Sequence, residues 1–363
     1  MARNFCWHAA ARAFALACPL LLVPAHATGL RAPGLGLPAI AEPADNPSTP
    51  EKIRLGRELF FDKRFSGDGK VSCATCHDPD KAFADGKPVA EGIDGRRGNR
   101  NTPTVLDAAY NAAQFWDGRR ATLEEQVLDP MFDANEHGLK SRDQLVGQVR
   151  ADDAYAAWFR RAFSVERGQI TAVEISRALA AFVRSLVSGN SPADRYLYGG
   201  DKAALSPEQI RGLDIFRGHA QCASCHQIGE RAALLIDGDY HSLSVGFERL
   251  APKLASLARQ LAHASGDEKA RIVQANPETS TLGRFLITLD PRDIGKFKTP
   301  SLRNVALTGP YMHDGSIATL EGTVNHEIYY RGRAQGRPLI LTPREKEDLV
   351  AFMNAWTSPN LPR

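Results

Sequence analysis

The sequence contains the pattern Cys-x-x-Cys-His twice, at residues 73–77 (CATCH) and 222–226 (CASCH). In each copy the two thiols can add to the vinyl groups of a haem, and the imidazole beside them can ligate its iron. The residues concerned are Cys73, Cys76, His77, Cys222, Cys225 and His226. We therefore expect two covalently bound haem c groups, and the chemistry then depends on what the protein places on the other face of each iron.

A thioredoxin-like dithiol and half of a zinc site are the alternative interpretations of one such motif. The two copies both end in His and lie 149 positions apart, and the only other cysteines are Cys6 and Cys18. A structural zinc site needs four Cys or His ligands that meet at one metal, and neither motif has further cysteines to complete it. Haem attachment is therefore the favoured interpretation.

Residues 1–27 are typical of a cleaved export signal. Arg3 and Arg12 precede an apolar stretch at 14–23, and the small-x-small pattern Ala-His-Ala follows. No other stretch approaches the roughly 20 apolar residues of a membrane span. We expect a soluble, exported protein without a membrane span, most simply periplasmic, in which every remaining cysteine carries haem.

The charges of the chain are nearly balanced, with 45 basic and 42 acidic residues. The formal net charge of +3 gives no reason to expect nucleic-acid binding. A chain of 363 residues can form two domains of ordinary size, one for each haem. The expected divisions are an extended leader at 28–50, an N-terminal domain at 51–190, a linker at 191–207 and a C-terminal domain at 208–358.

Apolar residues recur at helical spacing in most of the chain, and no long alternating strand is visible. The expected fold class is mainly α, with two cytochrome c-like haem domains packed around a shared interface. The helical patterns lie at 51–61, 122–127, 141–163, 171–187, 207–216, 247–273 and 342–356.

Three stretches, at 55–86, 100–136 and 296–316, closely resemble the bacterial di-haem cytochrome c peroxidase family, which includes the MauG-type enzymes. The resemblance covers most of 51–358 and fades at 228–296, where the chain carries its own insertion. It implies that peroxide reacts at the N-terminal haem and that the C-terminal haem handles electrons.

The resemblance also implies roles for single residues. Trp116 matches the tryptophan between the two haems, Gln126 and Glu136 match a distal-pocket amide and acid, and Pro130 matches a pocket-lining proline. These residue types suit the chemistry, because a carboxyl group over an open iron can take a proton from bound peroxide and return it to the leaving oxygen.

Asn101, Thr308 and Pro310 match positions at which the family holds a calcium ion between its domains. An amide oxygen and backbone carbonyls are suitable ligands for this hard cation. Water molecules would complete the coordination shell.

The chain departs from many family members at the first haem. They carry a second His ligand between the positions of Asp78 and Asn101, near Ile93, but this stretch contains no His. We expect the N-terminal iron to be open at rest, as in the MauG-like branch. His137 is the nearby residue that could close it.

The distal ligand of the second haem has three candidates. Counting from Pro310 gives Glu327, whereas aligning Tyr-Tyr-Arg-Gly with the family pattern gives Tyr329, which is the preferred candidate. His326 is chemically the strongest ligand of the three. The usual Met ligand is absent, and an anionic oxygen ligand would lower the reduction potential.

Three functions are compatible with these patterns. The first is an exported peroxidase that reduces hydrogen peroxide with electrons from a small cytochrome c or cupredoxin. The second is a MauG-like oxidase that forms a high-valent di-haem state and oxidises Tyr or Trp residues of a partner protein. The third is a non-catalytic electron-transfer cytochrome. A homodimer is compatible with each of them.

Overall fold

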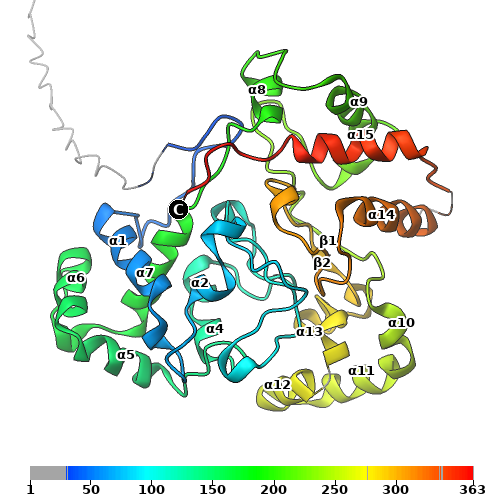
Figure 1. Cartoon of the computed structure of the whole chain (residues 1–363). Coiled ribbons are helices and arrows are strands. Elements are labelled where there is room, and N and C mark those ends of the chain that lie inside the picture. The colour runs from blue at the N-terminus through cyan, green and yellow to red at the C-terminus, as the bar shows by residue number, and fades with distance from the viewer. Residues whose placement is uncertain (1–29, 31, 276, 335, 337, 363) are drawn as a thin grey trace, which may run out of the picture.

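The computed structural model describes residues 30, 32–275, 277–334, 336 and 338–362. The proposed export signal, with Cys6 and Cys18, lies outside these residues. Helices dominate the described chain, which confirms the mainly α prediction (Figure 1). No helix among the described residues is long and apolar enough to cross a lipid bilayer.

The helices fall into an N-terminal group, a C-terminal group and a third group that is inserted in sequence between α9 (Pro207–Arg217) and α14 (Leu320–Ala334) of the C-terminal group (Figure 1). Two short antiparallel strands, β1 (Tyr240–His241) and β2 (Phe297–Lys298), flank the inserted group in sequence. The helices are α1 (Pro50–Phe61), α2 (Cys73–Cys76), α3 (Leu123–Gln126), α4 (Asp129–Phe132), α5 (Arg142–Ala151), α6 (Asp153–Phe163), α7 (Ala172–Ser185), α8 (Pro192–Tyr198), α9 (Pro207–Arg217), α10 (Phe247–Leu250), α11 (Leu254–His263), α12 (Gly266–Ala275), α13 (Phe285–Thr288), α14 (Leu320–Ala334) and α15 (Pro343–Asn354).

Several helices begin at a side chain that caps their first turn. The side chain of Thr49 accepts a hydrogen bond from the Lys52 amide at the start of α1, which also has a Pro at its first position. The pattern at 141–163 forms two helices because Asp152 has an extended backbone and caps α6. Reciprocal capping boxes start α7, with Thr171 and Glu174, and α15, with Thr342 and Glu345.

In the N-terminal unit (residues 50–187), α1 packs lengthwise against α7. Leu59 and Phe60 of α1 are buried against Leu179 and Phe182 of α7, and the rings of Phe60 and Phe182 lie 5.1 Å apart. Gly56 lets the two helices approach, because a Cβ at this position would overlap the backbone of α7. This helix pair forms the core behind the first haem motif.

The C-terminal unit (residues 192–358) repeats this plan with α9 and α15. Phe216 of α9 packs edge-on against Phe352 of α15, with 5.3 Å between the ring centroids. Gly212 permits the close contact, as Gly56 does in the first unit. Each haem motif therefore follows a helix that packs against the last helix of its own unit.

The inserted group α10–α13 has a small core of its own. Leu250, Leu257, Leu261, Leu282 and Phe285 are buried together there. The helical pattern predicted at 247–273 thus corresponds to three separate helices and a short 3-10 turn. The group occupies the lower right of Figure 1, below α14.

The leader and the expected linker connect both units. Asn46, in the leader, donates a hydrogen bond to Glu124 of α3, while the Gly36 carbonyl accepts one from Arg303 of the C-terminal unit. Residues 191–207, expected as a linker, contain α8, and Asp194 of this helix forms a fully buried ion pair with Arg303. The described part of the leader has no regular secondary structure before α1, and the hydrogen bonds of Asn46 and Gly36 attach it to the two units.

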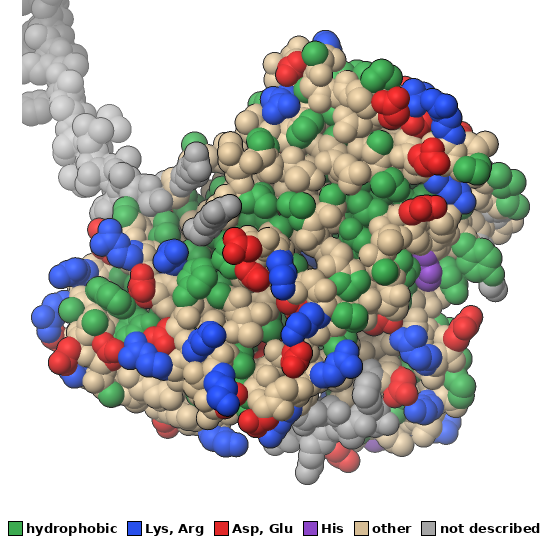
Figure 2. Space-filling view, in the orientation of Figure 1, with side chains coloured by type: hydrophobic (Ala, Val, Ile, Leu, Met, Phe, Trp, Pro, Cys, Tyr) green, Lys and Arg blue, Asp and Glu red, His purple; other side chains and the backbone are tan. Residues whose placement is uncertain are grey.

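The surface carries mixed charges. Figure 2 shows acidic and basic side chains interspersed over the visible face rather than gathered by sign. This distribution agrees with the nearly balanced charge of the sequence.

Candidate active site

The first haem motif forms the short helix α2, which ends at His77. The His77 amide donates to the Cys73 carbonyl over 2.8 Å, and its Nδ1 lies 3.1 Å from the Phe83 carbonyl oxygen. Because Nδ1 is engaged by a carbonyl, Nε2 remains available for iron. Burial lowers the pKa of His77, which favours the neutral imidazole that a metal requires.

The second motif has the same arrangement around His226. Its amide donates to the Cys222 carbonyl over 3.0 Å, and its Nδ1 lies 3.0 Å from the Leu235 carbonyl oxygen. Burial lowers the pKa of His226 to about 4. The four thiols of the two motifs are free and partly buried. These donor sets fit a covalently attached haem at each motif, with one axial imidazole each.

A cavity of about 280 Å³ lies in the N-terminal unit, and the charge of one of its wall residues, Glu136, acts on the thiols of the first motif. It is lined by Phe115, Arg119, Asp129, Pro130, Phe132, Asp133 and Glu136. Two residues expected in the distal pocket, Glu136 and Pro130, are therefore brought together here. Gln126 lies half-buried at the end of α3 and is not among the described residues that line the cavity, so its role in the pocket stays a prediction.

The Glu136 carboxyl group has an unusual environment. Burial raises its pKa to about 7; Asp133 adds to the shift, and Arg119 opposes it. The charge of Glu136 also acts on the thiols of Cys73 and Cys76, which places the carboxyl close to the haem-attachment sulfurs. A carboxyl group with this pKa can hold or release a proton near neutral pH.

The loop at 78–101 contacts the backbone of Glu136. The Ile93 amide donates to the Glu136 carbonyl over 2.9 Å, and the Ile93 side chain is buried. An apolar residue thus stands near the position at which many family members carry a His ligand. His137 is buried, and its Nδ1 lies 2.9 Å from the Phe65 carbonyl oxygen, so it does not line the cavity.

Trp116 lies where the N-terminal unit meets the C-terminal unit. Its indole Nε1 donates to the Asn101 carbonyl over 2.9 Å, while its own carbonyl accepts from the Lys298 amide of β2 over 2.8 Å. The Asn101 amide in turn donates to the His313 carbonyl over 2.8 Å. This geometry agrees with a position between two haem groups, and the electron-relay role stays a prediction.

Comparison with known proteins identifies the family. The family model for di-haem cytochrome c peroxidases matches residues 50–202. The methylamine utilization protein MauG of Methylorubrum extorquens is 36 % identical over 338 residues, covering 89 % of this chain and 85 % of that protein. The cytochrome-c peroxidase IdrP1 of Denitromonas iodatirespirans is 36 % identical over 354 residues, covering 94 % and 91 %.

The chain belongs to the di-haem cytochrome c peroxidase family. A solved structure of a MauG-like protein associated with microbial copper homeostasis has the same fold, with a TM-score of 0.71, 33 % identity and coverage of 89 % of this chain and 94 % of that one. The protein is therefore an oxidoreductase whose two motifs carry haem c.

The three candidates for the distal ligand of the second haem differ in their exposure and their contacts. Tyr329, the preferred candidate, is 56 % exposed. His326 places its Nε2 2.9 Å from the Leu243 carbonyl oxygen, where that nitrogen is already engaged. Burial raises the pKa of Glu327, and its charge acts on the thiols of Cys222 and Cys225. The choice among the three candidates stays a prediction.

Sequence reasoning missed a buried charged cluster next to Trp116. The Asp117 carboxylate accepts from Arg100 over 2.6 Å and from Arg119 over 3.1 Å. Burial would raise the pKa of Asp117, but the two guanidinium groups outweigh burial and lower it. Arg284 of the inserted group donates to the carbonyls of Asp117 and Gly118, so the insertion braces this loop. The run Trp-Asp-Gly-Arg-Arg at 116–120, with one acid next to two basic residues, is the sequence pattern from which this cluster could have been predicted.

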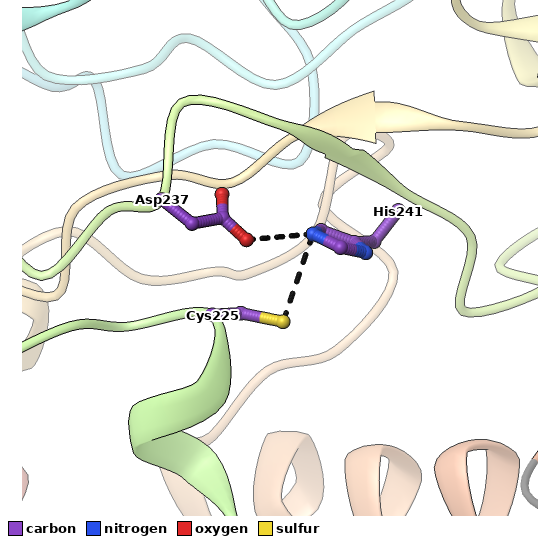
Figure 3. A group of neighbouring side chains, drawn as sticks. All are labelled: Cys225, Asp237 and His241. Carbon is purple, nitrogen blue, oxygen red and sulfur yellow. Dashed lines mark hydrogen bonds and ion pairs between the residues drawn. The ribbon is translucent and has the colours of Figure 1, made fainter.

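A second missed group surrounds Cys225. Figure 3 shows His241 between Asp237 and Cys225, with its Nε2 2.7 Å from the Asp237 carboxylate and 3.6 Å from the sulfur. Three such ligand atoms could hold a metal ion in principle. In this peroxidase the Cys225 sulfur becomes a thioether to haem, which removes the thiolate, so we assign no separate metal site here.

The residues expected at a calcium site lie near the contact between the units. The Asn101 side-chain nitrogen donates to the Lys87 carbonyl over 2.9 Å, which leaves its amide oxygen available. Thr308 and Pro310 lie a few residues before His313, and the carbonyl oxygen of His313 accepts the hydrogen bond from the Asn101 amide. Calcium binding by this peroxidase stays a prediction.

Proposed function

We propose that this family member reduces hydrogen peroxide to water at its N-terminal haem, using electrons that pass through its C-terminal haem. The observation that carries the proposal is the buried Glu136, whose pKa is raised to about 7, which borders a cavity and whose charge acts on the thiols of the first haem motif. A plain electron-transfer cytochrome has no use for an acid with such a pKa beside a haem motif.

The haem groups supply the iron that binds peroxide and the redox equivalents for cleavage of the O–O bond. Ionised Glu136 accepts a proton from one peroxide oxygen and returns it to the other as that oxygen leaves. The complete reaction consumes one peroxide, two electrons and two protons and yields two waters. Arg119, on the cavity wall, favours the ionised form of Glu136 that begins this sequence.

Trp116 is the proposed relay between the two haem groups. Its indole is held from the N-terminal unit by Asn101 and its backbone from the C-terminal unit by Lys298. Both contacts fix the ring at the junction, so the electron path does not depend on a mobile side chain. The expected electron donor is a small cytochrome c or a cupredoxin, met in the periplasm.

A MauG-like oxidation of Tyr or Trp residues in a partner protein is the second candidate. Ile93 and the absence of His from residues 78–101 favour it, because an iron open at rest needs no reductive activation. The 36 % identity with a MauG protein adds weight.

One experiment separates these functions. Low-temperature EPR spectra of the oxidised holoprotein are recorded before and after one equivalent of peroxide, and turnover is measured with reduced cytochrome c. A high-spin ferric signal that peroxide removes, with rapid turnover, is the result expected for a peroxidase. The same loss of signal with negligible turnover would favour the oxidase. Two low-spin signals that peroxide leaves unchanged would contradict both.

A further inference from the structure

We propose that Glu327 is the distal iron ligand of the second haem, through a carboxylate oxygen. The inference rests on the assignment of a haem to Cys222, Cys225 and His226, and it deepens the proposed function by defining the electron-entry site. A carboxylate oxygen at this position would differ from the phenol oxygen of Tyr and from the thioether sulfur of Met, which are the donors that the resemblance implied.

Glu327 lies on the buried side of α14. Leu320, Val324 and Ile328 of the same helix pack into the core of the C-terminal unit, and Glu327 follows Leu320 by seven positions and Val324 by three. Residues three, four and seven apart share one side of a helix. The sequence thus places an acid on the stripe that otherwise faces the core.

Two charged groups, Arg331 and His241, act on the Glu327 carboxylate and lower its pKa, but neither donates a hydrogen bond to it. Among the described residues it accepts no hydrogen bond and forms no ion pair. The guanidinium of Arg331, one turn later, instead donates to the backbone carbonyls of Ala220 and Gln221. Desolvation of a half-buried carboxylate that no donor contacts is costly, so a further positive centre is expected to face it. The iron of a haem attached at the second motif would supply that centre.

In both units, the charge of one carboxylate acts on the two thiols of the haem motif. The charge of Glu136 acts on Cys73 and Cys76, and the charge of Glu327 acts on Cys222 and Cys225. Each acid therefore lies close to one pair of haem-attachment sulfurs.

The free space around the two acids differs. Glu136 borders the cavity of about 280 Å³. The cavity of about 610 Å³ at the second motif is lined by Pro38, Arg217, Ala223, Gln227, Ile228, Gly229, Ala232, Leu234 and Ile236, and Glu327 is not part of its wall. Glu327 thus lines neither of these two cavities, whereas Glu136 lines the first.

The helical geometry also separates Glu327 from Tyr329. Two residues along a helix are rotated by about 200° at 3.6 residues per turn, so the two side chains point to opposite sides. Tyr329 is accordingly more than half exposed. Since an anionic oxygen ligand stabilises ferric iron, the second haem should have a lower reduction potential than a Met-ligated one.

The test uses the oxidised holoprotein and four variants: Glu327→Ala, Glu327→Met, Tyr329→Phe and, as a matched control on the exposed side of α14, Glu321→Gln. EPR spectra and the midpoint potential of each haem are measured. Glu327→Ala should convert the low-spin signal of the second haem to high-spin. Glu327→Met should keep it low-spin with a higher midpoint potential, and the Tyr329 and Glu321 variants should match the wild type.

An unchanged low-spin signal and midpoint potential in Glu327→Met would overturn the proposal, as would loss of the signal in Tyr329→Phe. A wild-type second haem that is high-spin would also overturn it. Glu327→Met keeps a ligand and so remains informative if Glu327→Ala fails to retain haem. The response of the first haem to peroxide tests the proposed function separately, because it does not involve residue 327.

Discussion

A single carboxyl group sets the proton chemistry of the first haem site. Because burial raises the pKa of Glu136 to about 7, the ionised base is lost as the pH falls through that value. We expect the rate of peroxide reaction to rise with pH through about 7. Glu136→Gln should lower the rate by about a hundredfold or more and abolish this dependence. Stopped-flow mixing with peroxide measures both, and an unchanged rate would exclude Glu136 as the acid–base group.

The two charged neighbours of Glu136 should move that pH dependence in opposite directions. Asp133 raises the pKa of Glu136, so Asp133→Asn should shift the rise in rate to lower pH. Arg119 lowers it, so Arg119→Gln should shift the rise to higher pH. The same stopped-flow series over pH checks both variants. Shifts of equal sign would show that another group controls the rate.

The buried ion pair between Arg303 and Asp194 should be important for stability. Their side chains are 1 % and 0 % exposed, and Arg303 also donates to the carbonyls of Gly36 and Ala233. Arg303→Leu leaves an unpaired buried carboxylate and should lower the free energy of unfolding by about 3–5 kcal/mol. Denaturant titration of the holoprotein measures this change.

The exposed pair of Arg292 and Asp290 provides the control for that prediction. The Arg292 side chain is 85 % exposed, so Arg292→Leu should change the free energy of unfolding far less than Arg303→Leu does. Equal effects of the two substitutions would mean that the buried pair contributes no more than a surface one.

At the scale of elements, the close contact of α9 with α15 depends on Gly212. A Cβ there would overlap the Asp348 carbonyl oxygen, so Gly212→Ala should force the helices apart and destabilise the protein by about 1–3 kcal/mol. Gly147→Ala, in α5, is the matched control, because no atom lies within 4 Å of its added Cβ. That change should stabilise the protein by about 0.5–1 kcal/mol. Thermal unfolding distinguishes the two, and stabilisation by both would contradict the packing argument.

At the scale of the whole molecule, a calcium ion between the units would couple them through Asn101. This residue bonds to both Trp116 and His313, so loss of the ion should disturb the relay position. Metal analysis should find about one calcium per chain, and chelation with EGTA should slow peroxide turnover until calcium, but not magnesium, is restored. Holoprotein that is fully active without bound calcium would exclude the site.

The sequence alone determined the features that depend on local spacing. The haem motifs and the helical periodicity involve residues a few positions apart, and the structure forms helices over the predicted stretches at 51–61 and 342–356. The family followed from longer motifs and was confirmed. Glu136 could be identified because it follows Trp116 at the family's spacing.

Only the tertiary structure decided which side chains are buried or exposed near each haem motif. Counting along the sequence left Glu327 and Tyr329 both possible, yet a shift of two positions turns a helical side chain to the opposite face. The burial of α8 in the expected linker and the bracing of Asp117 by Arg284 likewise join residues far apart in sequence. Local patterns specify which chemistry is available, but the packing of distant helices determines where each group points, because burial and charge depend on all neighbours in space.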